Sequence, residues 1–193
     1  PHGGLVLDIG CGAGQVLEKI VRIRPDLRLF GVDISQEALN VTSQKIKLEG
    51  LYLLSEDQFN LSHIGYSFDR IIMCHVLEHL RNPVVALQEA INCLNRNGSL
   101  VVGVPNPVTP RNIINIATGR HKVNEGHVCC WDIGHWKNFL ENIVNADTVH
   151  YDHDEAFIFR RDTKLSSIRK KFEIMVGSLL PGMSFTNFAV VKK

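Results

Sequence analysis

An apolar run that ends in an acid and three spaced glycines constrains the fold of this chain most. Residues 5–14 read LVLDIGCGAG, so a short buried strand leads through a glycine turn into a helix. This arrangement is typical of the first strand of a doubly wound α/β sheet, where the turn opens a nucleotide crevice. Each glycine lacks the Cβ that would hold backbone and ligand apart. The stretch therefore predicts a nucleotide-like ligand as well as a fold.

The spacing of the glycines separates two classes of ligand. Dinucleotide-binding proteins use G-x-G-x-x-G, whose third glycine lets the helix pack against the strand, but here Gln15 takes that place. Asp8 lies two residues before Gly10, where its carboxylate would repel a pyrophosphate and attract an ammonium or sulfonium group. We therefore expect a cationic nucleoside. A NAD-dependent oxidoreductase is the alternative, and Gln15 argues against it.

Residues 8–14 form D-x-G-x-G-x-G, which resembles motif I of the class I S-adenosylmethionine-dependent methyltransferases. The likeness continues through most of the chain and points to the bacterial group similar to the ubiquinone-biosynthesis methyltransferases. It implies the Rossmann-like methyltransferase fold, a doubly wound, seven-stranded, mostly parallel α/β sheet with an antiparallel last strand. It also implies S-adenosylmethionine as cofactor, S-adenosylhomocysteine as product and a small-molecule methyl acceptor, which we expect to accept through oxygen.

The cofactor-binding candidates follow the first four predicted strands. Asp33 ends the second strand and is placed to bind both ribose hydroxyls, or alternatively enters the next helix beside Ser35. The resemblance assigns adenine contacts to Asp57 and the next backbone amide, although Glu56 leaves this register open by one residue. The full set is Asp8, Gly10, Cys11, Gly12, Gly14, Asp33, Ile34, Asp57, Gln58, Cys74 and His75.

Residues 75–79 read HVLEH directly after a predicted strand. Read alone, H-x-x-E-H is the inverted zinc-protease signature, which needs both histidines on one long helix. Asn82-Pro83 signals a new helix too soon for that arrangement, which argues against a zinc hydrolase. Ubiquinone-pathway and small-RNA methyltransferases carry a similar E-x-x-E-H and use it for a divalent metal. Because His75 stands first here, we do not favour a metal.

Glu78, His79 and His127 are the catalytic candidates. His79 or His127 would be the base for an oxygen acceptor, with Glu78 as its orienter or as a metal ligand. Alternatively, Glu78 and His79 only cap the local turn, and His127 is merely exposed. His127 lies in residues 106–130, which we expect to be a substrate-side insertion because loops at the carboxyl edge of such a sheet build the pocket.

Apolar runs and helical patterns predict the other elements. Further strands are expected at 27–32, 51–54, 68–74, 100–104, 148–151 and 185–191, and further helices at 15–24 and 36–48. A helix with core residues Val84, Leu87, Ile91 and Leu94 should end at Asn97-Gly98, and a helix capped by Asp132 should bury Trp136, Phe139, Leu140 and Ile143. We expect an added amphipathic helix at 163–180, with its apolar face in the core or in a homodimer contact.

Length and composition predict a single domain over residues 1–193, since 45% hydrophobic content suffices for one core. The five cysteines form no C-x-x-C pair, and no apolar run approaches the roughly 18 residues of a membrane span. With no signal peptide before the first strand, we expect a cytoplasmic protein. The start of the chain almost on that strand suggests a missing N-terminal segment.

Charge is spread unevenly along the chain. Residues 160–193 hold eight Lys/Arg and two Asp/Glu, a balance of +6, whereas residues 1–159 hold 13 and 18, a balance of −5. The basic residues do not alternate with aromatic ones, so we expect a solvated face and no nucleic-acid partner. A membrane surface or a polyanion is the alternative partner. A non-catalytic cofactor-binding module is the remaining alternative function.

Overall fold

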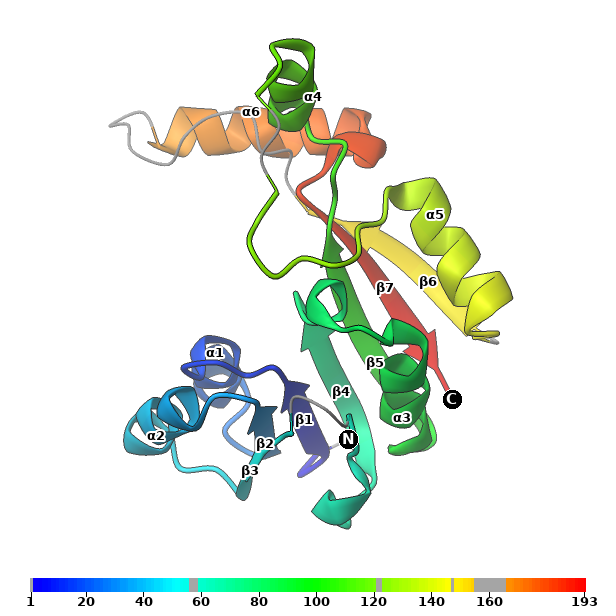
Figure 1. Cartoon of the computed structure of the whole chain (residues 1–193). Helices are drawn as coiled ribbons and strands as arrows, with labels where there is room; N and C mark the ends of the chain where they lie inside the picture. Colours follow the sequence, from blue (N-terminus) through cyan, green and yellow to red (C-terminus); the bar gives the residue numbers. More distant parts are fainter. Residues whose placement is uncertain (1, 56–58, 121–122, 147, 155–165) are drawn as a thin grey trace.

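The computed structural model describes residues 2–55, 59–120, 123–146, 148–154 and 166–193. Within them, seven strands form one sheet in the order β3-β2-β1-β4-β5-β7-β6. The strands are β1 (Leu5–Ile9), β2 (Arg28–Asp33), β3 (Gly50–Leu53), β4 (Phe68–Cys74), β5 (Leu94–Pro105), β6 (Thr148–His153) and β7 (Thr186–Lys192). Figure 1 shows this twisted sheet, with β3 and β6 at its two edges.

The direction of the strands confirms the expected fold class. β1 runs parallel to β2 and to β4, so the order of the sheet reverses at β1. Ligands of doubly wound sheets bind at such a switch point, outside the carboxyl ends of the strands. β7 runs antiparallel to both β5 and β6, and is therefore the strand of reversed direction that was expected at the end of the chain.

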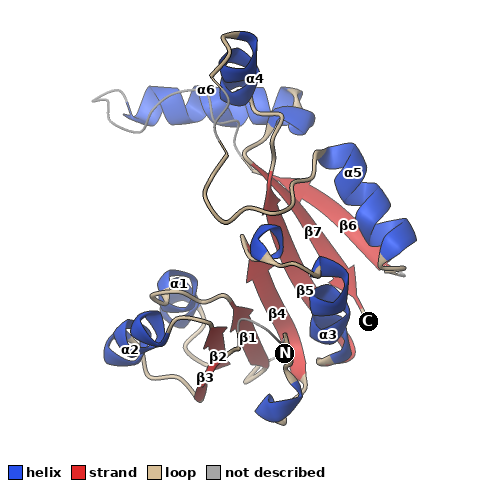
Figure 2. Ribbon diagram, viewed as in Figure 1, coloured by secondary structure: helices blue, strands red, loops and turns tan. Residues whose placement is uncertain are grey.

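Helices cover both faces of the sheet (Figure 2). They are α1 (Gln15–Ile23), α2 (Gln36–Lys45), α3 (Pro83–Asn92), α4 (Pro110–Ala117), α5 (Ile133–Asn138) and α6 (Ser166–Leu179). Single turns are η1 (Ser62–Ile64), η2 (Leu77–His79) and η4 (Pro181–Met183), and the π-helical η3 (Phe139–Ile143) extends α5. α1 and α2 lie against one face, whereas α3 and α5 lie against the other.

The alternation of side chains along β1 divides the core into two clusters. Val6 packs with the cluster of α1 and α2, which contains Leu17 and Leu39. Leu7 and Ile9 pack with the larger cluster on the opposite face. Because successive side chains of a strand point to opposite faces, Asp8 shares the face of Val6. Its carboxylate therefore lies beneath the glycine turn and α1.

Two sequence expectations are corrected at the ends of helices. The helix expected to reach Asn97-Gly98 ends at Asn92, and Leu94 begins β5 opposite Phe68. Leu94 is nevertheless buried, so the apolar pattern correctly predicted its burial but not whether it lies in a helix or a strand. Ile143, expected in the core, is 49% exposed because it lies in the π-helical segment, where wider turns rotate side chains away from the α-helical stripe.

The apolar face expected on the added helix is exposed where it is described. α6 forms within residues 163–180, but Phe172, Met175 and Leu179 are 44, 50 and 70% exposed. The prediction that this face packs in the core is therefore wrong for these three residues. α6 stands beyond the end of the sheet beside α4, where few other elements reach it (Figure 1). Among the described helices, none is long and apolar enough to cross a membrane.

Candidate active site

The turn after β1 adopts the conformation that its glycines allow. Gly10, Gly12 and Gly14 have φ angles of 72°, 52° and 77°, in the left-handed region that favours glycine. A Cβ at Gly10 would collide with Val76, and one at Gly14 would lie 2.9 Å from Thr42. A Cβ at Gly12 would meet nothing within 4 Å. The backbone at Gly12 therefore faces open space, where a ligand can approach it closely.

Asp8 is a buried acid that forms no ion pair with any basic residue in the described part of the chain. Its side chain is 3% exposed, and no hydrogen bond from any described residue reaches Oδ2. Burial raises the pKa of Asp8 from 3.8 to about 7, and the neighbouring charge of Asp33 adds to the effect. A buried carboxylate is costly unless a cation or a proton compensates it. The floor of the turn is thus suited to a cationic ligand.

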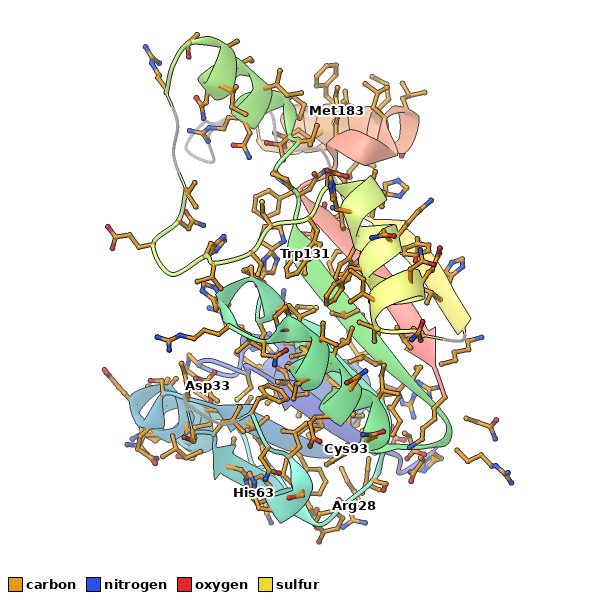
Figure 3. The ribbon with its side chains drawn as sticks, turned by 45° about the vertical axis from the view of Figure 1, so that its right-hand side comes forward. Arg28, Asp33, His63, Cys93, Trp131 and Met183 are labelled. Atoms are coloured by element: carbon orange, nitrogen blue, oxygen red, sulfur yellow. The ribbon has the colours of Figure 1, made fainter. Side chains whose placement is uncertain are left out.

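Asp33 is fixed at the carboxyl end of β2 (Figure 3). The backbone N–H of Gly12 donates to its Oδ2 at 2.7 Å, and that of Ser35 donates to its Oδ1 at 2.9 Å. The Ser35 side chain also caps α2, so the helix-entry role considered for Asp33 exists in the structure. A carboxylate has about four acceptor sites, so both oxygens can still accept from vicinal hydroxyls.

A cavity of about 890 Å³ opens beyond the ends of β2 and β3. Its size is within the range of small-molecule sites, roughly 300–1,000 Å³. Ile34, Leu54 and Leu80 give it apolar walls, and His79 and Arg81 give it polar groups. Its other lining residues are Ser55, Phe59, Asn60, Ser62, Asn82, Val85, Glu89 and Gly126. The adenine candidates Asp57 and Gln58 lie outside the described residues.

The segment after β4 buries one carboxylate among histidines. His75 has a φ of 57°, and Leu77–His79 forms the single turn η2 instead of a long helix. Glu78 is 1% exposed, and no described residue hydrogen-bonds to its carboxylate. The ring nitrogens His75 Nδ1 and His79 Nε2 lie 3.4 and 3.9 Å from Glu78 Oε1. The absence of a long helix agrees with the argument against a zinc-protease site.

The loop that carries His127 docks on this turn. The backbone N–H groups of Val128 and Cys129 donate to the carbonyl of Glu78 at 2.8 and 3.2 Å. His79 Nδ1 lies 3.2 Å from the carbonyl of Gly126, and the rings of His79 and His127 meet edge to face at 4.7 Å. The structure therefore brings together the three catalytic candidates, which come from segments some 50 residues apart.

The cluster has the chemistry of a base as well as that of a metal site. Partial burial lowers the pKa of His127, opposed by the charge of Glu78 and reinforced by His79 and His75. His127 is thus neutral at pH 7 and can accept a proton. One ligand atom each from Glu78, His79 and His127 lies within 4.8 Å of the others. Carboxylate and imidazole donors, one of them a buried carboxylate without a hydrogen-bond donor, fit a divalent cation.

Two thiols in the site, the buried Cys11 and the partly buried Cys74, are unsuited to act as nucleophiles. Burial raises the pKa of Cys11 and of Cys74 to about 12, with contributions from the charge of Asp8 at both. A thiol attacks as the thiolate, so both side chains are inert at neutral pH. The two residues can therefore contact a ligand only through their backbone, at the glycine turn for Cys11 and at the end of β4 for Cys74.

The structure also reveals residues that the sequence did not single out. Val76 packs against Gly10, and the Thr42 hydroxyl donates to the carbonyl of Gly12 at 2.9 Å. Thr186, at the start of β7, places its hydroxyl 3.5 Å from Nε2 of His75. Such contacts join segments far apart in the chain. No local pattern around Thr42 or Thr186 signals them.

The sheet order, the reversed last strand and the glycine turn above a buried acid are those of the Rossmann-like methyltransferase fold. Residues 7–100, just under half of the chain, match the model of the family described as "Methyltransferase domain". The match confirms the resemblance stated from motif I to S-adenosylmethionine-dependent methyltransferases.

Curated relatives support the same assignment. The chain is 29% identical over 107 residues to a demethylmenaquinone methyltransferase of Porphyromonas gingivalis, covering 53% of this chain and 43% of that protein. It is 31% identical over 111 residues to a ubiquinone biosynthesis O-methyltransferase of Glaesserella parasuis (54% and 46%). It is 30% identical over 109 residues to a probable fatty acid methyltransferase of Pseudomonas putida (52% and 26%). The chain thus spans less than half the length of these relatives.

Solved structures share the fold over the whole chain. The plantazolicin methyltransferase BpumL in complex with SAH superposes with a TM-score of 0.64 at 20% identity, covering 98% of this chain and 76% of that one. The small RNA methyltransferase HEN1 gives a TM-score of 0.72 at 18% identity, covering all of this chain and 23% of that one. At such identities the likeness concerns the fold alone.

Proposed function

We propose that this chain binds S-adenosylmethionine and transfers its methyl group to an oxygen of a small molecule. The observation that carries the proposal is the buried Asp8 carboxylate beneath a glycine turn whose backbone at Gly12 faces open space. A cationic cofactor would compensate that carboxylate, whereas a pyrophosphate would add a second negative charge. The match of residues 7–100 to a methyltransferase domain supports the same cofactor.

Each part of the cofactor has candidate contacts. Asp8 and the turn of Gly10, Cys11, Gly12 and Gly14 would hold the methionine part, and Asp33 would accept hydrogen bonds from the ribose hydroxyls. Ile34 leads into the cavity, where the adenine would lie. The backbone at Cys74 and His75 would line the cofactor from the end of β4. Asp57 and Gln58 keep their proposed adenine role from the sequence.

Methyl transfer asks little covalent chemistry of the protein. The acceptor oxygen attacks the methyl carbon in line with the sulfur, the carbon–sulfur bond breaks, and its electron pair stays on sulfur to give S-adenosylhomocysteine. The protein must hold the two reactants in line and take the acceptor's proton. His127, with its lowered pKa, or His79 would receive that proton, and Glu78 would orient the imidazoles.

Glu78, His79 and His127 would also be the residues that hold a divalent cation, if the enzyme uses one. A bound cation supplies Lewis acidity, which lowers the pKa of an acceptor hydroxyl. The two arrangements are alternatives, because an imidazole nitrogen that binds the cation is not free to take the acceptor's proton. The buried position of Glu78 excludes water from its charge.

The names of the relatives and the segments at the carboxyl edge of the sheet support a small apolar molecule as the acceptor. Proteins similar to this chain are named for demethylmenaquinone, ubiquinone biosynthesis and fatty acids, which indicates a small apolar acceptor. Residues 106–130, whose described part includes α4 and the His127 loop, would shape the acceptor pocket. The five free cysteines support a reducing, cytoplasmic setting.

Isothermal titration calorimetry with S-adenosylmethionine and, separately, NAD tests the proposal. We expect binding of S-adenosylmethionine in the micromolar range, no binding of NAD, and loss of binding in Asp33→Ala. Asp152→Ala, which changes an exposed aspartate on β6, is the matched control and should bind normally. Binding of NAD alone would favour an oxidoreductase. Binding of S-adenosylmethionine without turnover on any acceptor would favour a cofactor-binding module.

A further inference from the structure

Two helices at the carboxyl edge of the sheet expose most of their apolar side chains. α4 has no buried residue, and its Ile113, Ile114 and Ile116 are 40, 60 and 58% exposed. On and just after α6, Ile174, Met175, Leu179 and Leu180 are 47, 50, 70 and 49% exposed. We call these seven residues the α4–α6 surface. A helix of eight residues is not stable in water by itself, so its apolar side needs cover from outside the described protein.

The two helices stand at the same end of the sheet. Figures 1 and 3 both place α4 beside α6, beyond the ends of β4 and β5. The Asn106 side chain, in the connection that leads into α4, donates to the carbonyls of Gly182 and Ser184 at 2.9 and 2.8 Å. Asn106 is buried, so this tie between the two segments is shielded from water. The exposed apolar residues of both helices therefore belong to one end of the molecule.

Basic residues outnumber acidic ones on these two helices. Residues 110–120 contain Arg111 and Arg120 and no acid, and α6 contains three consecutive basic residues, 169–171. Its one acid, Glu173, is 5% exposed. Exposed apolar side chains among basic ones are the pattern of helices that lie in the interface of an anionic membrane.

We infer that the α4–α6 surface docks on an anionic lipid bilayer, with its apolar residues at the depth of the headgroups. The basic excess on α4 and α6 favours this occupant over a second copy of the chain, because a twofold contact between these helices would bring two sets of basic residues together. Docking would turn the carboxyl edge of the sheet toward the bilayer. Docking would then present the acceptor pocket to an apolar acceptor dissolved in the bilayer, and this step rests on the proposed function.

Co-sedimentation with lipid vesicles tests the inference. The chain should sediment with vesicles of phosphatidylglycerol and phosphatidylcholine, far less with phosphatidylcholine alone, and less at high salt. The double variant Ile114→Asp, Leu179→Asp should reduce the vesicle-bound to free ratio at least tenfold. Ile23→Asp, which changes a residue 77% exposed at the end of α1, is the matched control and should bind as the wild type does.

Three results would overturn the inference. One is equal sedimentation of the double variant and the wild type, and another is no preference of the wild type for anionic vesicles. The third is a wild-type dimer in analytical ultracentrifugation that the double variant abolishes while vesicles bind neither, which would give the surface to a second copy. Titration of the double variant with S-adenosylmethionine separates the two proposals, since cofactor binding should persist when vesicle binding is lost.

Discussion

Replacing Asp8 by Asn should stabilise the protein without ligand and weaken its hold on the cofactor. In the unfolded chain Asp8 ionises near pH 4, whereas burial keeps it protonated in the folded chain until about pH 7. Between these pH values the folded state binds more protons than the unfolded state. Its contribution to the free energy of unfolding therefore falls as the pH rises, and is lowest above pH 7.

The size of the effect follows from the two pKa values. Raising the pKa from 3.8 to about 7 corresponds to an upper limit of about 4 kcal/mol against the ionised form. Asparagine keeps the shape of the side chain and carries no charge. The difference in unfolding free energy between Asp8→Asn and the wild type should thus be small at pH 4.5 and reach 2–4 kcal/mol, as an order of magnitude, at pH 8.

Urea denaturation at both pH values, followed by circular dichroism, measures this difference. Asp152→Asn on the exposed edge of β6 is the control and should show no growth of the difference with pH. S-adenosylmethionine should stabilise the wild type much more than Asp8→Asn at pH 8, because the cationic cofactor compensates only the carboxylate. A wild type that is as stable as Asp8→Asn at pH 8 would show that the buried carboxylate does not destabilise the folded protein.

Three further predictions concern the turn and the histidine cluster. Gly12→Ala and Gly119→Ala both place alanine at a positive φ in open space, so each should lower the free energy of unfolding measured by calorimetry by about 1–2 kcal/mol. Only Gly12→Ala should also weaken the affinity for S-adenosylmethionine, by tenfold or more. Glu78→Gln should keep the melting temperature and lower kcat by about 100-fold or more in a methyl-transfer assay, and an unchanged kcat would contradict its role. The methyl-transfer rate of the wild type should fall as the pH is lowered, with a midpoint below pH 6.5, and this fall should be absent from the pH–rate profile of His127→Ala. The same fall in His127→Ala would exclude His127 as the base.

Local patterns sufficed to predict the glycine turn and most of the strands, whereas the antiparallel last strand was expected from the family resemblance. The apolar run of residues 5–9, the turn residues after it and the acid that ends β2 are each encoded within a few positions, and the structure has them where expected. The limits of that reasoning show at Leu94 and Ile143. Leu94 is buried in a strand instead of a helix, and Ile143 is turned outward by a π-helical segment.

The site was predictable only in part, because its surroundings depend on tertiary contacts. The sequence brought Glu78, His79 and His127 forward as residue types with suitable chemistry. It could not show that the backbone after His127 binds the carbonyl of Glu78, which is what brings the two segments together. The contacts of Val76 with Gly10 and of Thr186 with His75 likewise join distant strands, and only the folded sheet reveals them.

The number of protons released on cofactor binding shows whether the buried Asp8 carboxylate faces the cationic ligand. S-adenosylmethionine would be titrated into the wild type and into Asp8→Asn at pH 6, in two buffers of different ionisation enthalpy. We predict that the wild type releases close to one proton as Asp8 ionises against the cationic ligand, and that any residual binding by Asp8→Asn releases none. No binding heat, or equal proton release from the two proteins, would contradict the claim that this turn was built around a cationic nucleoside.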